Sequence, residues 1–150
     1  MCSSDLTYAF LHGNLMHLAL NMFALWMFGA AVEQTWGSAG MARVYLTSVV
    51  SGAVAQLIVG AALGGGGAPV VGASAGVFGL LLIYALEFPQ RRLILLFLPI
   101  PIPARTFVAG YAALELMLGL FGDHRSGIAH FAHLGGLLGA GLVWMGQRRR

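Results

Sequence analysis

The sequence is poor in charged residues, contains no lysine and has one cysteine. Only 9% of its 150 residues are charged, whereas 59% are hydrophobic. A soluble domain carries about a quarter charged residues, so this chain could not cover its apolar surface in water. Cys2 alone excludes an internal disulfide. The net charge of +3 is too small and too scattered for a nucleic-acid surface. The composition predicts a membrane protein.

The first residues carry no basic cluster ahead of an apolar run, so we expect no signal peptide. A helix needs about 20 mostly apolar residues to cross a bilayer. Apolar runs of about this length predict an all-α bundle of about five transmembrane helices. They cover residues 11–32, 41–63, 72–88, 104–121 and 128–146. Residues 33–38 are expected to form the first turn.

Residues 93–103 do not fit this pattern. The segment is apolar but too short to span, and Pro99, Pro101 and Pro103 prevent a regular helix. We therefore expect a connector that lies at the membrane interface or against the bundle.

The arginines predict the orientation of the bundle. With the amino terminus outside, five passes put seven of the eight arginines on one side of the membrane, and only Arg125 on the other. The seven are Arg43, Arg91, Arg92, Arg105, Arg148, Arg149 and Arg150. Because arginine is enriched on the cytoplasmic side of membrane proteins, the carboxyl terminus is predicted to be cytoplasmic.

Three polar residues fall at one depth in this arrangement. His17, Ser74 and His133 all lie within roughly 10 Å of the outer edge of their spans. Polar groups inside a membrane normally face the bundle interior, which makes the three a candidate site. The alternative for Ser74 is that it only caps the start of a helix, because it follows a glycine-rich loop.

The chemistry of these residues suggests nucleophilic catalysis. A serine hydroxyl becomes a good nucleophile when a base removes its proton, and an imidazole can do so near neutral pH. His133 is the favoured base, because the glycines that follow it would let its helix pack closely on the helix of Ser74. These glycines are Gly135, Gly136, Gly139 and Gly141, facing Gly72, Gly76 and Gly79. His17 and Asn21 are four residues apart, so both could donate hydrogen bonds to one oxyanion together with the Ser74 amide.

The order of these motifs resembles that of the rhomboid intramembrane serine proteases. Residues 10–38, with His17 and Asn21, resemble their second helix and the loop after it. Gly72-Ala73-Ser74-Ala75-Gly76 is similar to their nucleophile motif, and Ala132-His133-Leu134-Gly135-Gly136 to their catalytic-histidine motif. The proline-rich segment 99–103 is similar to a connector of many bacterial members. The resemblance covers residues 10–143.

The resemblance implies a Ser74–His133 dyad without a third acidic member. It assigns oxyanion stabilisation to His17 and Asn21, and supporting roles to Gly72 and Phe78. It implies cleavage of transmembrane protein substrates in the lipid bilayer without a metal or cofactor, at the bacterial inner membrane.

The family core has six helices, so the resemblance also predicts that the first helix is missing here. Residues 1–9 are then a truncated start, 10–147 the transmembrane domain and 148–150 a cytoplasmic basic tail. A chain without that helix could instead be an inactive rhomboid-like binder of membrane helices.

Other interpretations of the polar residues remain. The Gly-x-Ser-x-Gly pattern also fits the nucleophile elbow of α/β-hydrolases, but no strand precedes it. His130 and His133 could suggest a metal pair, yet no His-Glu-x-x-His motif occurs, so His130 is expected to be structural. Glu115 is predicted to make a hydrogen bond within the bundle, with a proton relay in a small transporter as the alternative.

Overall fold

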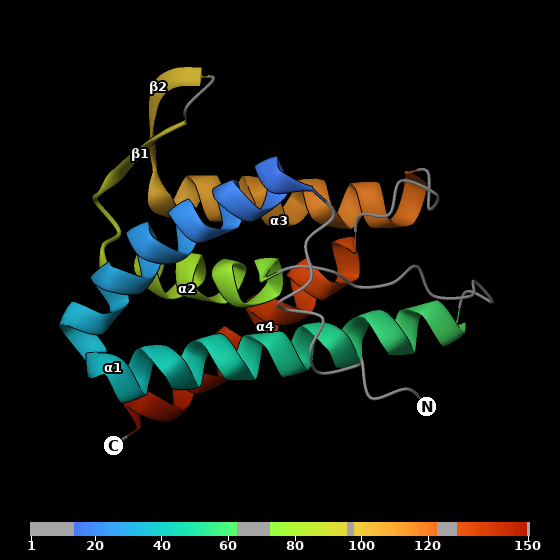
Figure 1. Cartoon of the computed structure of the whole chain (residues 1–150), viewed down its shortest axis with the longest axis horizontal. Helices are drawn as coiled ribbons and strands as arrows, with labels where there is room; N and C mark the ends of the chain where they lie inside the picture. The colour runs from blue at the N-terminus through green and yellow to red at the C-terminus, as the bar shows by residue number, and fades with distance from the viewer. Residues whose placement is uncertain (1–13, 63–72, 96–97, 123–128, 150) are drawn as a thin grey trace.

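The computed structural model describes residues 14–62, 73–95, 98–122 and 129–149. This part of the chain forms a helical bundle with a small antiparallel hairpin between its second and third helices (Figure 1). The helices are α1 (Leu15–Ala62), α2 (Ser74–Glu87), α3 (Ala104–Phe121) and α4 (His130–Arg148), and the strands are β1 (Arg92–Leu95) and β2 (Leu98–Pro103). The predicted all-α membrane bundle is confirmed, with the hairpin as an addition.

α1 consists of two helical segments that meet at Gly37. This residue has φ 71° and ψ 170°, a conformation that glycine adopts without steric cost. The two segments, residues 15–36 and 38–62, diverge from the kink as the blue and teal parts of Figure 1. They correspond to the first two predicted spans. The predicted turn over residues 33–38 was too long, because only Gly37 leaves the helix and Ser38 donates a hydrogen bond to the Glu33 carboxylate.

α2 is the central helix of the bundle. Its sequence is apolar around its whole circumference, which is typical of a helix buried on all sides. Leu80 and Ile83 are fully buried, and Val77 is nearly so. With 14 residues the helix is about 21 Å long, less than the roughly 30 Å of a bilayer core. A helix of this length does not reach across the whole bilayer core, and its first residue is Ser74.

The proline-rich connector forms a hairpin rather than an irregular segment. β1 and β2 pair antiparallel, with Arg92 opposite Pro103 and Leu93 opposite Ile102, and after a shift of register Leu95 lies opposite Leu98. Proline lacks an N–H group, but both strands of a two-stranded sheet are edge strands, where this loss is tolerated. The periodicity of the segment could not predict the pairing, because alternating prolines usually argue against a strand.

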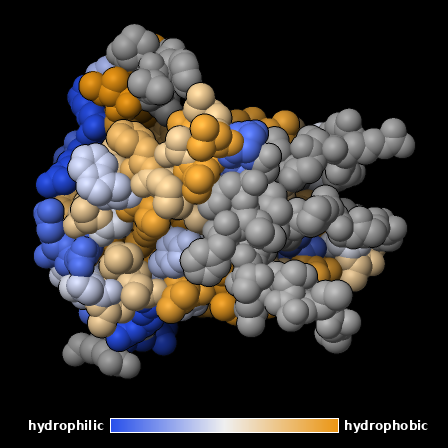
Figure 2. All heavy atoms as spheres, viewed as in Figure 1, coloured by the Kyte–Doolittle hydropathy of each residue, from blue (hydrophilic) through white to orange (hydrophobic). Residues whose placement is uncertain are grey.

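The surface of the bundle is that of a membrane protein. α1 and α3 are long and apolar enough to cross a bilayer, judged by length and composition. Large apolar side chains are exposed on their outer faces, as lipid contact requires. They include Trp26, Leu57 and Ile58 on α1, and Met117 and Phe121 on α3. Figure 2 shows hydrophilic residues gathered at the end of the bundle where α1 kinks and α4 finishes.

Candidate active site

Ser74 is the first residue of α2, and its side chain does not cap the helix. The N-cap position is Ala73, which makes no side-chain capping hydrogen bond. The N–H groups of a first helical turn have no partner within the helix and carry the positive end of its dipole. Ser74 therefore lies where a negative charge that develops on a bound group is favoured.

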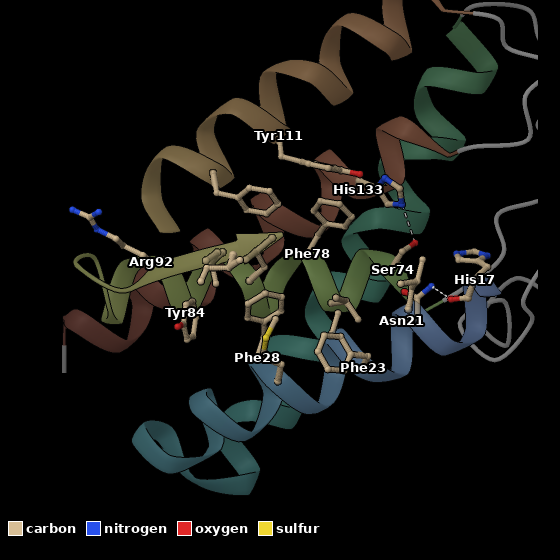
Figure 3. A pocket seen from close by; sticks show the side chains of 18 residues that line it. His17, Asn21, Phe23, Phe28, Ser74, Phe78, Tyr84, Arg92, Tyr111 and His133 are labelled. Carbon is tan, nitrogen blue, oxygen red and sulfur yellow. Dashed lines mark hydrogen bonds between the residues drawn. The ribbon is translucent and has the colours of Figure 1, made fainter. Parts of the chain in front are cut away.

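The Ser74 hydroxyl pairs with a ring from another helix. Its Oγ lies 2.9 Å from Nε2 of His133, on the first turn of α4 (Figure 3). The ring of Phe78, one turn after Ser74, stacks on the His133 ring with 4.5 Å between centroids and an interplanar angle of 22°. The hydroxyl of Ser74 and the ring of Phe78, which both contact His133, belong to residues that the sequence singled out.

Close packing of backbones brings α2 and α4 together at this point. A Cβ atom on Gly136 would overlap the backbone carbonyl of Ala75, the residue after Ser74. A Cβ on Gly52, in the second half of α1, would lie 2.7 Å from both the Ala132 carbonyl oxygen and the Ala75 Cβ. The small residues on α1, α2 and α4 thus set how closely Ser74 and His133 approach each other. His133 directly follows Ala132, and Ser74 directly precedes Ala75.

The glycines do not all pack as the sequence suggested. The predicted contact of α4 with α2 occurs at Gly136, but Gly76 faces Tyr45 of α1 and Gly139 faces Ser51 of α1. The hydroxyl of Ser51 also donates a hydrogen bond of 2.8 Å to the Gly135 carbonyl. The second half of α1 therefore shares the interface that sequence reasoning assigned to α2 and α4 alone. Gly72 lies outside the described residues.

His17 and Asn21 lie on the first half of α1, beside Ser74 in Figure 3. Asn21 is buried, and its Nδ2 donates a hydrogen bond of 2.9 Å to the His17 carbonyl. The start of this helix is held by Asn14, whose Oδ1 accepts a 2.7 Å hydrogen bond from the His17 amide. His17 and Asn21 line the same cavity as Ser74 and His133.

That cavity has a volume of about 830 Å³ and runs between the first half of α1, α2, α3 and β1. Its walls are mostly apolar, and in Figure 3 Arg92 marks the end remote from His133. The polar end holds a hydroxyl, two imidazoles and an amide. The apolar lining includes Leu20, Phe23, Met27, Phe28, Val77, Leu81, Leu93, Ile94 and Phe107. Such a cavity can hold an apolar chain against a nucleophile at one end.

The carboxylate of Glu115 lies behind His133. It is 3% exposed, and its Oε2 lies 2.7 Å from Nδ1 of His130, the hydrogen bond within the bundle that the sequence predicted. Its Oε1 lies 3.1 Å from Nδ1 of His133, which is ion-pair distance without hydrogen-bond alignment. Sequence reasoning did not place Glu115 at the site. The available signal was the three-residue spacing of His130 and His133, which puts both rings on one face of α4.

A profile of the Rhomboid domain family matches residues 3–149 of the chain. "Presenilin-associated rhomboid-like protein, mitochondrial" of Mus musculus is 32% identical over 96% of this chain and 40% of its own length. "Rhomboid protein 1, mitochondrial" of Saccharomyces cerevisiae is 31% identical over 91% of this chain and 39% of its own length. "Rhomboid protease GluP" of Bacillus subtilis is 32% identical over 89% of this chain and 24% of its own length. The chain thus spans two fifths or less of these relatives.

Proposed function

Because this chain belongs to the rhomboid family, we propose that it is a serine endopeptidase that cleaves transmembrane segments of other membrane proteins. The observation that carries the proposal is the 2.9 Å separation of Ser74 Oγ and His133 Nε2. The Bacillus relative, rhomboid protease GluP, is named for the same activity, which supports the proposal.

The proposed reaction is acyl transfer through a dyad. Ser74 Oγ attacks the scissile carbonyl carbon while His133 Nε2 takes the hydroxyl proton. The tetrahedral intermediate collapses, the C–N bond breaks, and His133 returns the proton to the leaving amine. Water then attacks the acyl-serine ester and gives a proton to His133. The ester C–O bond breaks, His133 returns that proton to Ser74 Oγ, and the carboxylic acid product leaves.

The oxyanion of the intermediate would be held at the start of α2. Donors proposed for it are the Ser74 amide, the Asn21 side chain and the His17 ring, which share the cavity end with the nucleophile. Donors fixed in place stabilise the developing charge without having to reorient during the reaction. Phe78, stacked on His133, would keep the ring in plane for both proton transfers.

The cavity supports the proposed substrate class. Its apolar walls suit the side chains of a transmembrane segment, whereas its polar end suits a peptide bond exposed by local unwinding. The protein is proposed to be a multi-pass protein of the bacterial inner membrane with a cytoplasmic carboxyl terminus.

A second candidate is a rhomboid-like protein that binds membrane helices without cleaving them. The names of two relatives, a rhomboid-like protein and a rhomboid protein, state no protease activity and so leave this candidate open. The cavity would then hold a helix and leave it intact.

Cleavage of a fluorescently labelled transmembrane substrate in proteoliposomes tests the proposal. Ser74→Ala and His133→Ala are each expected to reduce the cleavage rate by several orders of magnitude, because the two groups act as one unit. Ser38→Ala, a serine at the α1 kink far along the chain from the site, is the matched control and should retain the wild-type rate. Equal cleavage by wild type and Ser74→Ala would exclude a serine protease, and substrate binding without cleavage would favour the helix binder.

A further inference from the structure

Glu115 lies on the single stripe by which α3 meets the bundle. The buried residues of α3 are Ala104, Val108, Glu115 and Gly119, whose spacing of four, seven and four puts them on one helix face. The other faces of α3 carry exposed apolar side chains such as Leu114 and Met117. Burying a carboxylate on the inward face of an apolar helix costs free energy. The groups that pair with it therefore indicate what it does.

Two rings of α4 share this carboxylate. Oε2 faces His130 at 2.7 Å, and Oε1 faces His133 at 3.1 Å. Tyr111, one turn before Glu115 on α3, interacts with the same carboxylate. On the far side of the His133 ring, Nε2 meets Ser74 of α2. The order of groups is therefore carboxylate, imidazole and hydroxyl, contributed by three helices.

We propose that Glu115 is a positioning residue for His133, so that the site is a Ser–His–Glu arrangement rather than a dyad. The proposal rests on the proposed protease function. Glu115 keeps the proton of the neutral ring on Nδ1, which leaves the Nε2 lone pair free to receive the Ser74 proton. When that proton arrives, the carboxylate stabilises the imidazolium. No proton passes to Glu115, which remains a carboxylate throughout.

His130 holds the Glu115 carboxylate in position. Its bond to Oε2 fixes one carboxylate oxygen, and the geometry of a carboxylate then directs Oε1 at His133. A purely structural carboxylate is available for comparison. Glu87, at the other end of α2, accepts a 3.0 Å hydrogen bond from Trp144 Nε1 of α4 and is not among the residues that line the cavity.

The kinetic test uses Glu115→Gln, which keeps the shape of the side chain and removes its charge. We expect kcat for the labelled substrate to fall roughly 10²-fold or more with KM nearly unchanged, because an amide NH₂ beside Nδ1 favours the wrong ring tautomer. Glu115→Asp, which keeps the charge, should recover part of that loss. Glu87→Gln removes an equivalent carboxylate between α2 and α4, and it should keep the wild-type kcat. Wild-type kcat in Glu115→Gln would overturn the proposal.

A spectroscopic test does not depend on cleavage. In ¹⁵N-histidine-labelled protein, the His133 signals, assigned by their loss in His133→Ala, should show a protonated Nδ1 and a bare Nε2 at neutral pH. Glu115→Gln should shift this ring toward the Nε2-protonated form, while Glu87→Gln leaves it unchanged. A wild-type ring protonated on Nε2 would overturn the proposal even if Glu115→Gln fails to fold. Absence of cleavage with the expected tautomer would instead count against the protease function alone.

Discussion

Two asparagines, Asn14 just before α1 and Asn21 on it, illustrate how residues of one type differ in role. Asn14 caps the helix by accepting a hydrogen bond from the His17 amide, at the boundary of the described chain. Asn21, two turns later, is buried and lines the cavity beside Ser74. The sequence placed both on one span as polar interruptions and singled out only Asn21. The tertiary structure separates the stabilising residue from the candidate catalytic one.

Replacing each asparagine by alanine should affect a different property, kcat for Asn21 and stability for Asn14. Asn21→Ala is expected to lower kcat by about 10² to 10³, because an oxyanion donor acts mainly in the transition state. Asn14→Ala should lower stability by about 1 kcal/mol through the lost cap and leave kcat unchanged. Cleavage kinetics and thermal unfolding in detergent measure the two effects. If Asn21→Ala keeps its kcat, the amide is not an oxyanion donor.

At the scale of elements, the position of His133 depends on how closely α4 approaches its neighbours. Gly136 lies against the Ala75 carbonyl, whereas the open side of α4 carries Gly146 with no atom within 4 Å of its would-be Cβ. A methyl group is therefore excluded at one position and accommodated at the other. The sequence singled out Gly136 and not Gly146, and the packing shows why only Gly136 excludes a side chain.

Gly136→Ala is expected to destabilise the protein by about 1–3 kcal/mol, because the new methyl group forces α4 away from α2. Cleavage by the folded variant should also fall, since a displacement of about 1 Å between catalytic groups can cost about 10²-fold in rate. Gly146→Ala, on the same helix, should be neutral or stabilising by up to about 1 kcal/mol. Thermal unfolding and initial cleavage rates test the pair. Equal unfolding temperatures for the two variants would contradict the proposed role of the Gly136 contact.

At the scale of the whole molecule, most charged side chains of the described residues gather at one end. The α1 kink, the end of α2, the start of α3 and the end of α4 lie together at this end, opposite to Ser74 (Figure 1). Arg148 stacks on Trp144 at 4.3 Å, and Arg91 on Phe88 at 4.2 Å. Arginine and aromatic side chains together are typical of a membrane interface. The arrangement favours a cytoplasmic position for this end and an outer position for the site.

Cysteine labelling tests this orientation. In a Cys2→Ser background, Phe121→Cys places a thiol at the end of α3 near the site, and Ser38→Cys places one at the kink of α1. A membrane-impermeant maleimide added to intact cells should label the first and not the second. Both should react once the membrane is dissolved in detergent, which controls for accessibility. The reverse pattern in intact cells would show that the arginine-rich end is outside.

Much of the fold and part of the site could be predicted from the sequence. Hydrophobic length determined the spans, because the thickness of a bilayer fixes how many apolar residues a helix needs. Ser74 and His133 were identifiable because polar residues are rare enough in such spans to be conspicuous. The hairpin β1–β2 was not predicted, since its pairing depends on two segments meeting in space. The single-residue kink at Gly37 depends on a positive φ that composition does not reveal.

By itself, then, the sequence determined a membrane helix bundle with a serine and two histidines at one depth, because hydropathy and spacing along a helix are local properties. Only the tertiary structure decided which ring meets Ser74, that Asn21 and His17 share its cavity, and that Glu115 lies behind His133. The physical reason is that depth in a membrane does not specify the rotation of a helix about its axis. That rotation is set by contacts between helices, such as the approach of Gly136 to Ala75, which join residues distant in the sequence.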